Sequence, residues 1–347
     1  MTKSNPGNFL EDFRVGQAIT HATPRTITEG DVALNIALTG SRYAMFCADA
    51  FAQNCGYPGA PIDPLLVFHT VFGKSVPDIS LNAVANLGYA EGRFLAPVYP
   101  GDTLYAQSDV LGVKQNSNGK TGVVTVRTAG INQEGETVLS YVRWVMVNKR
   151  DAGAAITDAP PETPKPFVPA SELLLPPVLD FSGYQPEFAG SAHVFEDYAV
   201  GEKIDHVDGM TVEEAEHQIA TRLYQNTAKV HFDALAQQGS RFGKRLIYGG
   251  VAISLARSLA FNGLANAQLM LAINGGRHVN PLFAGDTLYA WSEVLAKEDL
   301  GAAGALRLRL VAVKNRPAAG FPFKTDAGEY DPAVVLDFDY WAAIPKR

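Results

Sequence analysis

One histidine in the second half of the chain is the clearest candidate for acid–base chemistry. His231 lies in the polar segment 224–233, together with Asn226 and Asp233. Imidazole titrates near pH 6.5, so it can accept and release a proton at working pH. The carboxamide of Asn226 cannot accept a proton, but it can orient a water molecule or a hydroxyl group. Asp233 is either an assisting carboxylate or a simple helix cap.

A pair of glycines marks a second position where chemistry could occur. Gly249 and Gly250 stand at the start of a strongly apolar stretch, 250–261, which we predict to be a buried helix. Backbone N–H groups at the start of a helix can stabilise negative charge on a reacting oxygen. The same pair would also suit a tight turn that needs positive φ, and the two interpretations are compatible.

Three arginines could bind a carboxylate of a ligand, because a guanidinium presents two parallel donors. They are Arg42, Arg93 and Arg277, although each residue of this type is more commonly an ordinary surface or ion-pair residue. The basic loop 241–245 precedes the glycine pair and could meet phosphate groups.

The remaining histidines give weaker signals. His69 falls in an apolar stretch and suits the core, whereas His278 follows an arginine on a predicted strand and could reach a pocket. The others lie in polar stretches, where we expect solvated side chains: His21, His193, His206 and His217. No group of His, Cys and carboxylate residues has metal-site spacing, and no glycine-rich nucleotide loop is present. We therefore expect no metal and no cofactor.

Composition limits the class of protein. The 47% of apolar and 19% of charged residues are typical of a globular enzyme, and the net charge of −7 disfavours a nucleic-acid partner. No apolar run reaches the roughly 20 residues of a membrane helix, and residues 1–7 are not followed by a signal-peptide core. With Cys47 and Cys55 as the only cysteines, we expect a cytoplasmic protein with reduced thiols and no membrane partner.

The chain contains one pattern twice. The residues Gly-Asp-Thr-Leu-Tyr-Ala at 101–106 return at 285–290, a period of 286 − 102 = 184 residues, which indicates duplicated domains. Eight prolines stand between Asp151 and Pro186, and proline excludes this stretch from a helix or a sheet interior. We therefore predict a first repeat over 1–150, an extended linker over 151–190 that packs on a surface, and a second repeat over 191–347.

Each repeat should contain two helices followed by antiparallel strands. Thr28 and Thr211 could cap helices over 31–38 and 213–224, and apolar helices follow over 64–72 and 250–261. The pair Asn118-Gly119 predicts a hairpin. Strands are expected over 104–114, 123–131, 138–147, 288–295, 306–313 and 334–341. Helices first and strands afterwards indicate an α+β class.

These features resemble the MaoC-like (R-specific hydratase) family, in the form of a tandem double hotdog with two antiparallel sheets each wrapped round a central helix. The resemblance rests on the Arg…Pro…Gly-Asp-Thr-Leu pattern at 93–104 and 277–288, and on the segment 224–232. The family pattern Asp-x-Asn-Pro-aliphatic-His-x-Asp falls on 226–233. Val230, His231 and Asp233 match it, whereas Asn226, Ala228 and Lys229 depart from it.

The resemblance implies a role for each candidate in the second repeat. His231 would be the acid–base group, Asn226 would position water, Asp233 would have a mainly supporting role, and Gly250 with Gly249 would form the oxyanion site. In the first repeat the matching segment 41–49 lacks a base, and Pro64 has no N–H at the start of its helix. We therefore expect one active site per chain, with the first repeat catalytically degenerate and contributing an acyl pocket.

The implied activity is that of a cofactor-free hydro-lyase acting on a short, branched, carboxylated acyl-CoA thioester. The leading reaction is the reversible loss of water from β-methylmalyl-CoA to give mesaconyl-CoA, by a homodimer of double-hotdog chains. The alternatives are a general enoyl-CoA hydratase, a hotdog thioesterase and a non-catalytic acyl-CoA binding protein. The missing Asp at position 226 is the reason to retain the non-catalytic binding protein as an alternative.

Overall fold

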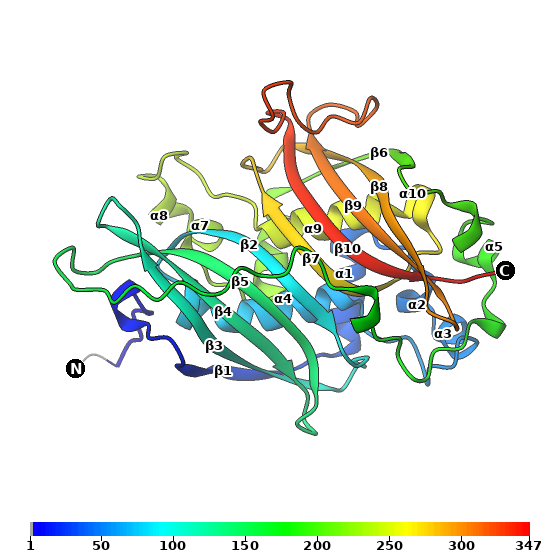
Figure 1. Cartoon of the computed structure of the whole chain (residues 1–347), viewed down its shortest axis with the longest axis horizontal. Coiled ribbons are helices and arrows are strands. Elements are labelled where there is room, and N and C mark those ends of the chain that lie inside the picture. The colour runs from blue at the N-terminus through cyan, green and yellow to red at the C-terminus, as the bar shows by residue number, and fades with distance from the viewer. Residues whose placement is uncertain (1–2) are drawn as a thin grey trace.

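The computed structural model describes residues 3–347, and these form one antiparallel sheet of ten strands with helices on its inner face (Figure 1). The strand order is β1-β3-β4-β5-β2-β7-β10-β9-β8-β6, so each half supplies five strands in mirrored order. The strands are β1 (Ala18–Thr26), β2 (Ala83–Phe94), β3 (Thr103–Gln115), β4 (Thr121–Ile131), β5 (Thr137–Asn148), β6 (Lys203–Thr211), β7 (Leu269–His278), β8 (Thr287–Asp299), β9 (Gly304–Lys314) and β10 (Val334–Ile344). The α+β double hotdog is confirmed, with the two five-stranded sheets joined where β2 pairs with β7.

Two apolar helices, one from each half, lie against this sheet. They are α4 (Pro64–Ser75) and α9 (Gly249–Leu259), and every residue of α4 is buried. The remaining helices are α1 (Glu29–Thr39), α2 (Ala44–Cys47), α3 (Asp49–Gln53), α5 (Pro186–Ala189), α6 (Glu214–Leu223), α7 (Lys229–Phe232), α8 (Ala234–Gln237) and α10 (Phe261–Leu264). A π-helical turn over Val76–Ser80 extends α4.

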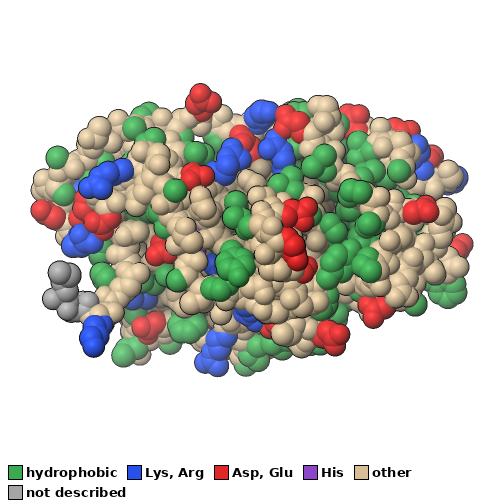
Figure 2. Space-filling view, turned by 90° about the horizontal axis from the view of Figure 1, so that it is seen from below, with side chains coloured by type: hydrophobic (Ala, Val, Ile, Leu, Met, Phe, Trp, Pro, Cys, Tyr) green, Lys and Arg blue, Asp and Glu red, His purple; other side chains and the backbone are tan. Residues whose placement is uncertain are grey.

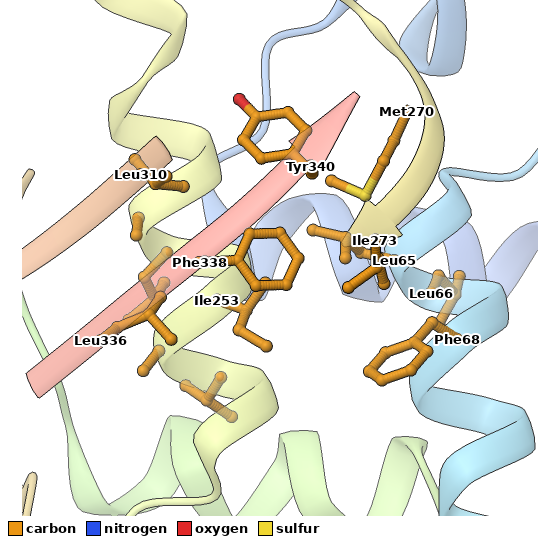
Figure 3. Packing of buried hydrophobic residues seen from close by; sticks show 14 of the residues in the cluster. Leu65, Leu66, Phe68, Ile253, Met270, Ile273, Leu310, Leu336, Phe338 and Tyr340 are labelled. Atoms are coloured by element: carbon orange, nitrogen blue, oxygen red, sulfur yellow. The ribbon is translucent and has the colours of Figure 1, made fainter. Parts of the chain in front are cut away.

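The two halves share one hydrophobic core. In Figure 3, Leu65 and Phe68 of α4 point toward the same interior as Ile253 of α9 and Phe338 of β10. All four side chains are almost fully buried, and burial of an aliphatic or aromatic side chain contributes about 1.5–3 kcal/mol. The core therefore holds the helix starts and the strand ends of both halves in fixed relative positions.

The predicted elements are largely confirmed, with shifts of one to three residues at most ends. Thr28 caps α1 as expected, since its side chain accepts from the Asp31 N–H, and Gly119 adopts φ +65° in the β3–β4 hairpin. Thr211 was wrong as a cap: α6 begins after Glu213, and the Thr211 hydroxyl bonds the Thr287 hydroxyl instead. Strands β1 and β6 were not expected, because their exposed face is polar and hides the alternation.

The proline-rich linker runs along the outer face of the sheet, on the side away from the helices (Figure 1). It packs there as expected: Val168 is fully buried, and its carbonyl accepts from the Trp341 indole N–H at 3.0 Å. Proline does not exclude it from all regular structure, however. Pro186 begins the short helix α5, because the first helical residue needs no N–H donor, and Ala159 forms a bridge to Val113. The three-part division at 150 and 190 stays a prediction.

The surface carries mixed charge. On the face shown in Figure 2, basic side chains are scattered among acidic and apolar ones, unlike the clustered basic surface that binds nucleic acid. Within residues 3–347 no helix is long and apolar enough to cross a membrane. Cys47 and Cys55 are both free, as predicted.

Candidate active site

A cavity of about 430 Å³ opens at the junction of the two halves, and it contains the predicted acid–base residue. Its second-half wall includes Asn226, His231, Tyr248, Gly249 and His278. Its first-half wall is mostly apolar, with Phe72, Val76, Ala83 and Tyr89, and also carries Ser80 and Asn86. The catalytic candidates thus come from the second half, and the first half supplies part of the apolar lining.

A glycine on α4 allows the two halves to meet so closely at this point. A side chain at Gly73 would overlap the carbonyl of Tyr224 and approach the N–H of Asn226. The segment that carries Asn226 and leads into α7 therefore lies directly on α4 of the other half.

His231 lies on α7, and its imidazole is held in one tautomer. Its Nδ1 lies 2.9 Å from the Leu246 carbonyl, which can only accept, so the proton is on Nδ1 and the lone pair is on Nε2. Burial lowers the pKa of His231 to about 4, although the bond to the Leu246 carbonyl opposes this shift. The ring is therefore neutral near pH 7 and able to accept a proton at Nε2.

Asn226 presents a hydrogen-bond donor and not an acceptor. Its Oδ1 accepts from the Ala228 N–H at 3.1 Å, which fixes the orientation of the carboxamide. Its Nδ2 is buried and has no hydrogen-bond partner within residues 3–347, although the residue lines the cavity. A buried donor without a partner is costly, so it indicates a place for an oxygen atom of a ligand.

Gly249 and Gly250 form the first turn of α9, where backbone N–H groups have no acceptor inside the helix. Neither glycine has positive φ, so the tight-turn interpretation is wrong. Both positions exclude a side chain: a Cβ at Gly249 would overlap the His278 ring, and one at Gly250 would overlap Tyr248 and His69. The glycines therefore allow side chains to approach the start of a helix that carries partial positive charge.

His217 and Tyr248 support this helix start and were not predicted. His217 on α6 is buried, and its Nε2 accepts from the Tyr248 N–H at 2.9 Å. Burial, followed by the neighbouring His231 and Arg245, lowers the pKa of His217 to about 3, which keeps its ring neutral. The Tyr248 ring lies 5.5 Å from the His231 ring and 5.6 Å from the Phe72 ring. A tyrosine directly before the glycine pair was the available sequence signal.

Asp233 and the three predicted arginines do not line this cavity. Asp233 caps α8, because its Oδ1 accepts from the Ala236 N–H at 3.0 Å. The exposed Arg42 lies over the Phe261 ring at 4.4 Å, and Arg93 forms an ion pair with Glu172 of the linker. Arg277 lies on the opposite face of the sheet, since it directly precedes the inward-facing His278 on β7. Arg241, from the basic loop, does line the cavity.

Three histidines that were expected to be solvated are buried: His21, His206 and His217. His21 and His206 occupy equivalent places on β1 and β6, and each bonds a serine hydroxyl of the neighbouring strand. Because those two strands were not predicted, neither was the burial. His193 is exposed as expected, and His69 is in the core, where Nε2 bonds the Ser254 hydroxyl at 2.9 Å.

Comparison with known proteins gives relatives over the whole chain. The chain is 60% identical to a β-methylmalyl-CoA dehydratase from Chloroflexus aurantiacus, covering 99% of each sequence. It is 59% identical to a mesaconyl-CoA hydratase from Cereibacter sphaeroides, covering 99% of this chain and all of the relative. A family model for mesaconyl-CoA hydratase matches residues 2–173. The chain belongs to the mesaconyl-CoA hydratase family.

Solved structures agree with this family and its fold. A MaoC domain dehydratase from Chloroflexus aurantiacus superimposes with a TM-score of 0.97 at 59% identity, over the full length of both chains. A Mycobacterium tuberculosis protein described as a double hotdog has a TM-score of 0.78 at 23% identity, covering 97% of this chain and 98% of the other. The second likeness concerns the fold alone.

Proposed function

We propose that this chain is a hydro-lyase that interconverts mesaconyl-CoA with β-methylmalyl-CoA by adding or removing water. One observation carries the proposal: a neutral imidazole with its lone pair on Nε2 lines a cavity that also contains the start of α9. The relatives at 59–60% identity, which are named for these two substrates, supply the substrate class.

The chemistry needs one base and one site for negative charge. In hydration, Nε2 of His231 takes a proton from water, and the resulting hydroxide adds to the β-carbon of the enoyl thioester. Electrons move to the thioester oxygen, where the N–H groups at the start of α9 stabilise the charge. The protonated imidazole then delivers its proton to the α-carbon, which restores the neutral ring. Dehydration follows the same steps in reverse.

Asn226 would assist as a donor to the oxygen that enters or leaves. Its Nδ2 has no partner among the described residues, whereas Oδ1 is already engaged by the Ala228 N–H. The carboxamide can therefore hold water, or the β-hydroxyl group, by donating to its oxygen. In this arrangement His231 is the only proton-transferring group that the mechanism requires.

A buried cation behind the apolar wall supports a substrate with a free carboxylate. Arg143 of β5 is fully buried, and its guanidinium lies 4.2 Å from the centre of the Phe72 ring. It donates to the Ser75 hydroxyl at 2.8 Å and forms no ion pair with any carboxylate of residues 3–347. A buried charge without a counter-ion is costly, so an anionic acyl group near Phe72 and Ser80 would be favoured over a neutral one.

The other parts of the proposal concern coenzyme A and assembly. Arg241 lines the cavity with its neighbour Phe242, and it is exposed, so it can pair with a phosphate of coenzyme A. Coenzyme A would be part of the substrate, and the proton transfers need no additional cofactor. We also propose that two double-hotdog chains form a homodimer in the cytoplasm. Sedimentation of the purified protein would test whether it is a dimer.

The function is tested by incubating the purified chain with mesaconyl-CoA and, separately, with crotonyl-CoA, and by following the loss of enoyl absorbance. Faster turnover of mesaconyl-CoA is the expected result. Preference for crotonyl-CoA would instead identify a general enoyl-CoA hydratase. Tight binding of both thioesters without turnover would identify an acyl-CoA binding protein and would refute the catalytic proposal.

A further inference from the structure

A second imidazole shares the cavity with His231. His278 ends β7 and lines the same cavity, opposite the start of α9. Its Nε2 packs against the backbone of Gly249 so closely that any Cβ at that position would overlap the ring. The Tyr89 hydroxyl lies 3.4 Å from the same nitrogen, which is at the long limit of a hydrogen bond. The nitrogen is therefore held at the helix start without a strong partner.

We propose that His278 donates an Nε2–H hydrogen bond to the thioester oxygen of the substrate, beside the backbone N–H groups at the start of α9. This inference rests on the proposed hydratase function, and it adds a side-chain member to the oxyanion site. Its position against Gly249 is the observation that carries it, because the same helix start is where the thioester oxygen gains negative charge.

The surroundings of His278 keep its ring neutral. The titratable groups around it are Tyr89 on β2, His231 on α7 and His69 on α4, and it forms no ion pair with a carboxylate in the described part of the chain. Burial, followed by the charge of a protonated His231, lowers the pKa of His278 to about 4. A neutral imidazole still has one N–H, so it can polarise a carbonyl without transferring its proton.

This role differs from that of a second acid–base group. Acid–base work needs a titrating ring, whereas donation to the oxyanion needs only an N–H at the right place. Glutamine offers such an N–H but does not titrate near neutral pH. His278→Gln and His278→Ala therefore separate the two roles, and His193→Ala, at an exposed position, is the matched control.

The test is steady-state hydration of mesaconyl-CoA by the full-length wild type and these three variants, with thermal unfolding of each. We expect His278→Ala to lower kcat by roughly 10²-fold, the usual size for the loss of one oxyanion donor, and His278→Gln to stay within about tenfold of the wild type. His193→Ala should match the wild type.

Two results would overturn the inference: a kcat of His278→Ala within about threefold of the wild type, or a His278→Gln variant as slow as the Ala variant while both remain folded. If His278→Ala does not fold, Gly249→Ala tests the same geometry, because its methyl group must displace the ring; unchanged kcat there would also overturn it. A wild type without enoyl-CoA hydratase activity would refute the proposed function first, so the two failures are distinguishable.

Discussion

Replacing Asn226 with Asp tests what the carboxamide does in the cavity. The R-specific hydratase pattern has Asp at this position, so an Asn226 that held water as a hydrogen-bond acceptor would tolerate the change and retain substantial activity. The structure favours the opposite result, because Oδ1 already accepts from the Ala228 N–H and only Nδ2 is left for a ligand. A carboxylate can replace Oδ1, but its second oxygen would be an acceptor where the reaction needs a donor.

The size of the loss follows from burial. Asn226 is 1% exposed, so a substrate oxygen there is shielded from water and cannot find a substitute donor. Loss of one buried oxyanion-type donor costs about 3–4 kcal/mol, which corresponds to roughly 10²–10³-fold in kcat. The Asp variant would also place a negative charge near the carboxylate of mesaconyl-CoA. The Ala variant lacks both the donor and the charge, so it should be less impaired than the Asp variant.

The assay is hydration of mesaconyl-CoA and of crotonyl-CoA by Asn226→Asp, Asn226→Ala and the wild type, with thermal unfolding as a control for folding. We expect the order wild type, Ala, Asp, and a smaller gap between Ala and Asp with crotonyl-CoA, which lacks the free carboxylate. An Asp variant faster than the Ala variant on both substrates would refute the donor role of Nδ2 and would indicate that Asn226 holds water as a hydrogen-bond acceptor.

Three further predictions concern the buried cation, the histidines with lowered pKa values and the two halves. Arg143→Met should lower kcat/KM for mesaconyl-CoA about tenfold more than for crotonyl-CoA, and an equal loss on both would make Arg143 merely structural. Burial lowers the pKa values of several histidines well below 6.5, their value in the unfolded chain, so the unfolded state binds more protons than the folded state between about pH 6.5 and 4. The urea concentration at the unfolding midpoint should therefore fall as the pH is lowered from 7 to 5. An unchanged midpoint would contradict this. The histidines concerned are His69, His206, His217, His231 and His278. Residues 1–150 expressed alone should aggregate or swap strands, since β2 would lose its partner β7, and a well-behaved monomer by light scattering would be the contrary result.

The fold was predictable because its signals are local and repeated. Each signal depends only on residues close together in sequence: the apolar run of α4, the Asn118-Gly119 turn, and the hexapeptide at 101–106 and 285–290. The repetition of the hexapeptide then shows that the chain has two similar halves. Strands β1 and β6 were missed because they are edge strands with a polar outer face. Their burial of His21 and His206 depends on serines about 86 residues away in sequence, which no local pattern reveals.

Site residues could be predicted only where they form part of a recognisable sequence pattern. His231, Asn226 and Gly249 all line one cavity, but the orientation of the Asn226 carboxamide depends on the Ala228 N–H and could not be read from residue types. Arg277 was predicted to bind the substrate but lies on the wrong face of the sheet, because neighbouring residues along β7 occupy opposite faces. The buried Arg143 gave no signal, since its lack of an acidic partner is a property of the packed chain.

Hydration of mesaconyl-CoA by His231→Ala, measured beside the wild type and the exposed-site control His193→Ala, shows whether His231 transfers the proton in this reaction. We expect the wild type to consume the enoyl thioester, the control to do so at the same rate, and the folded His231→Ala variant to have a kcat lower by at least about 10²-fold. A folded His231→Ala variant that hydrates mesaconyl-CoA at nearly the wild-type rate would contradict this role of His231.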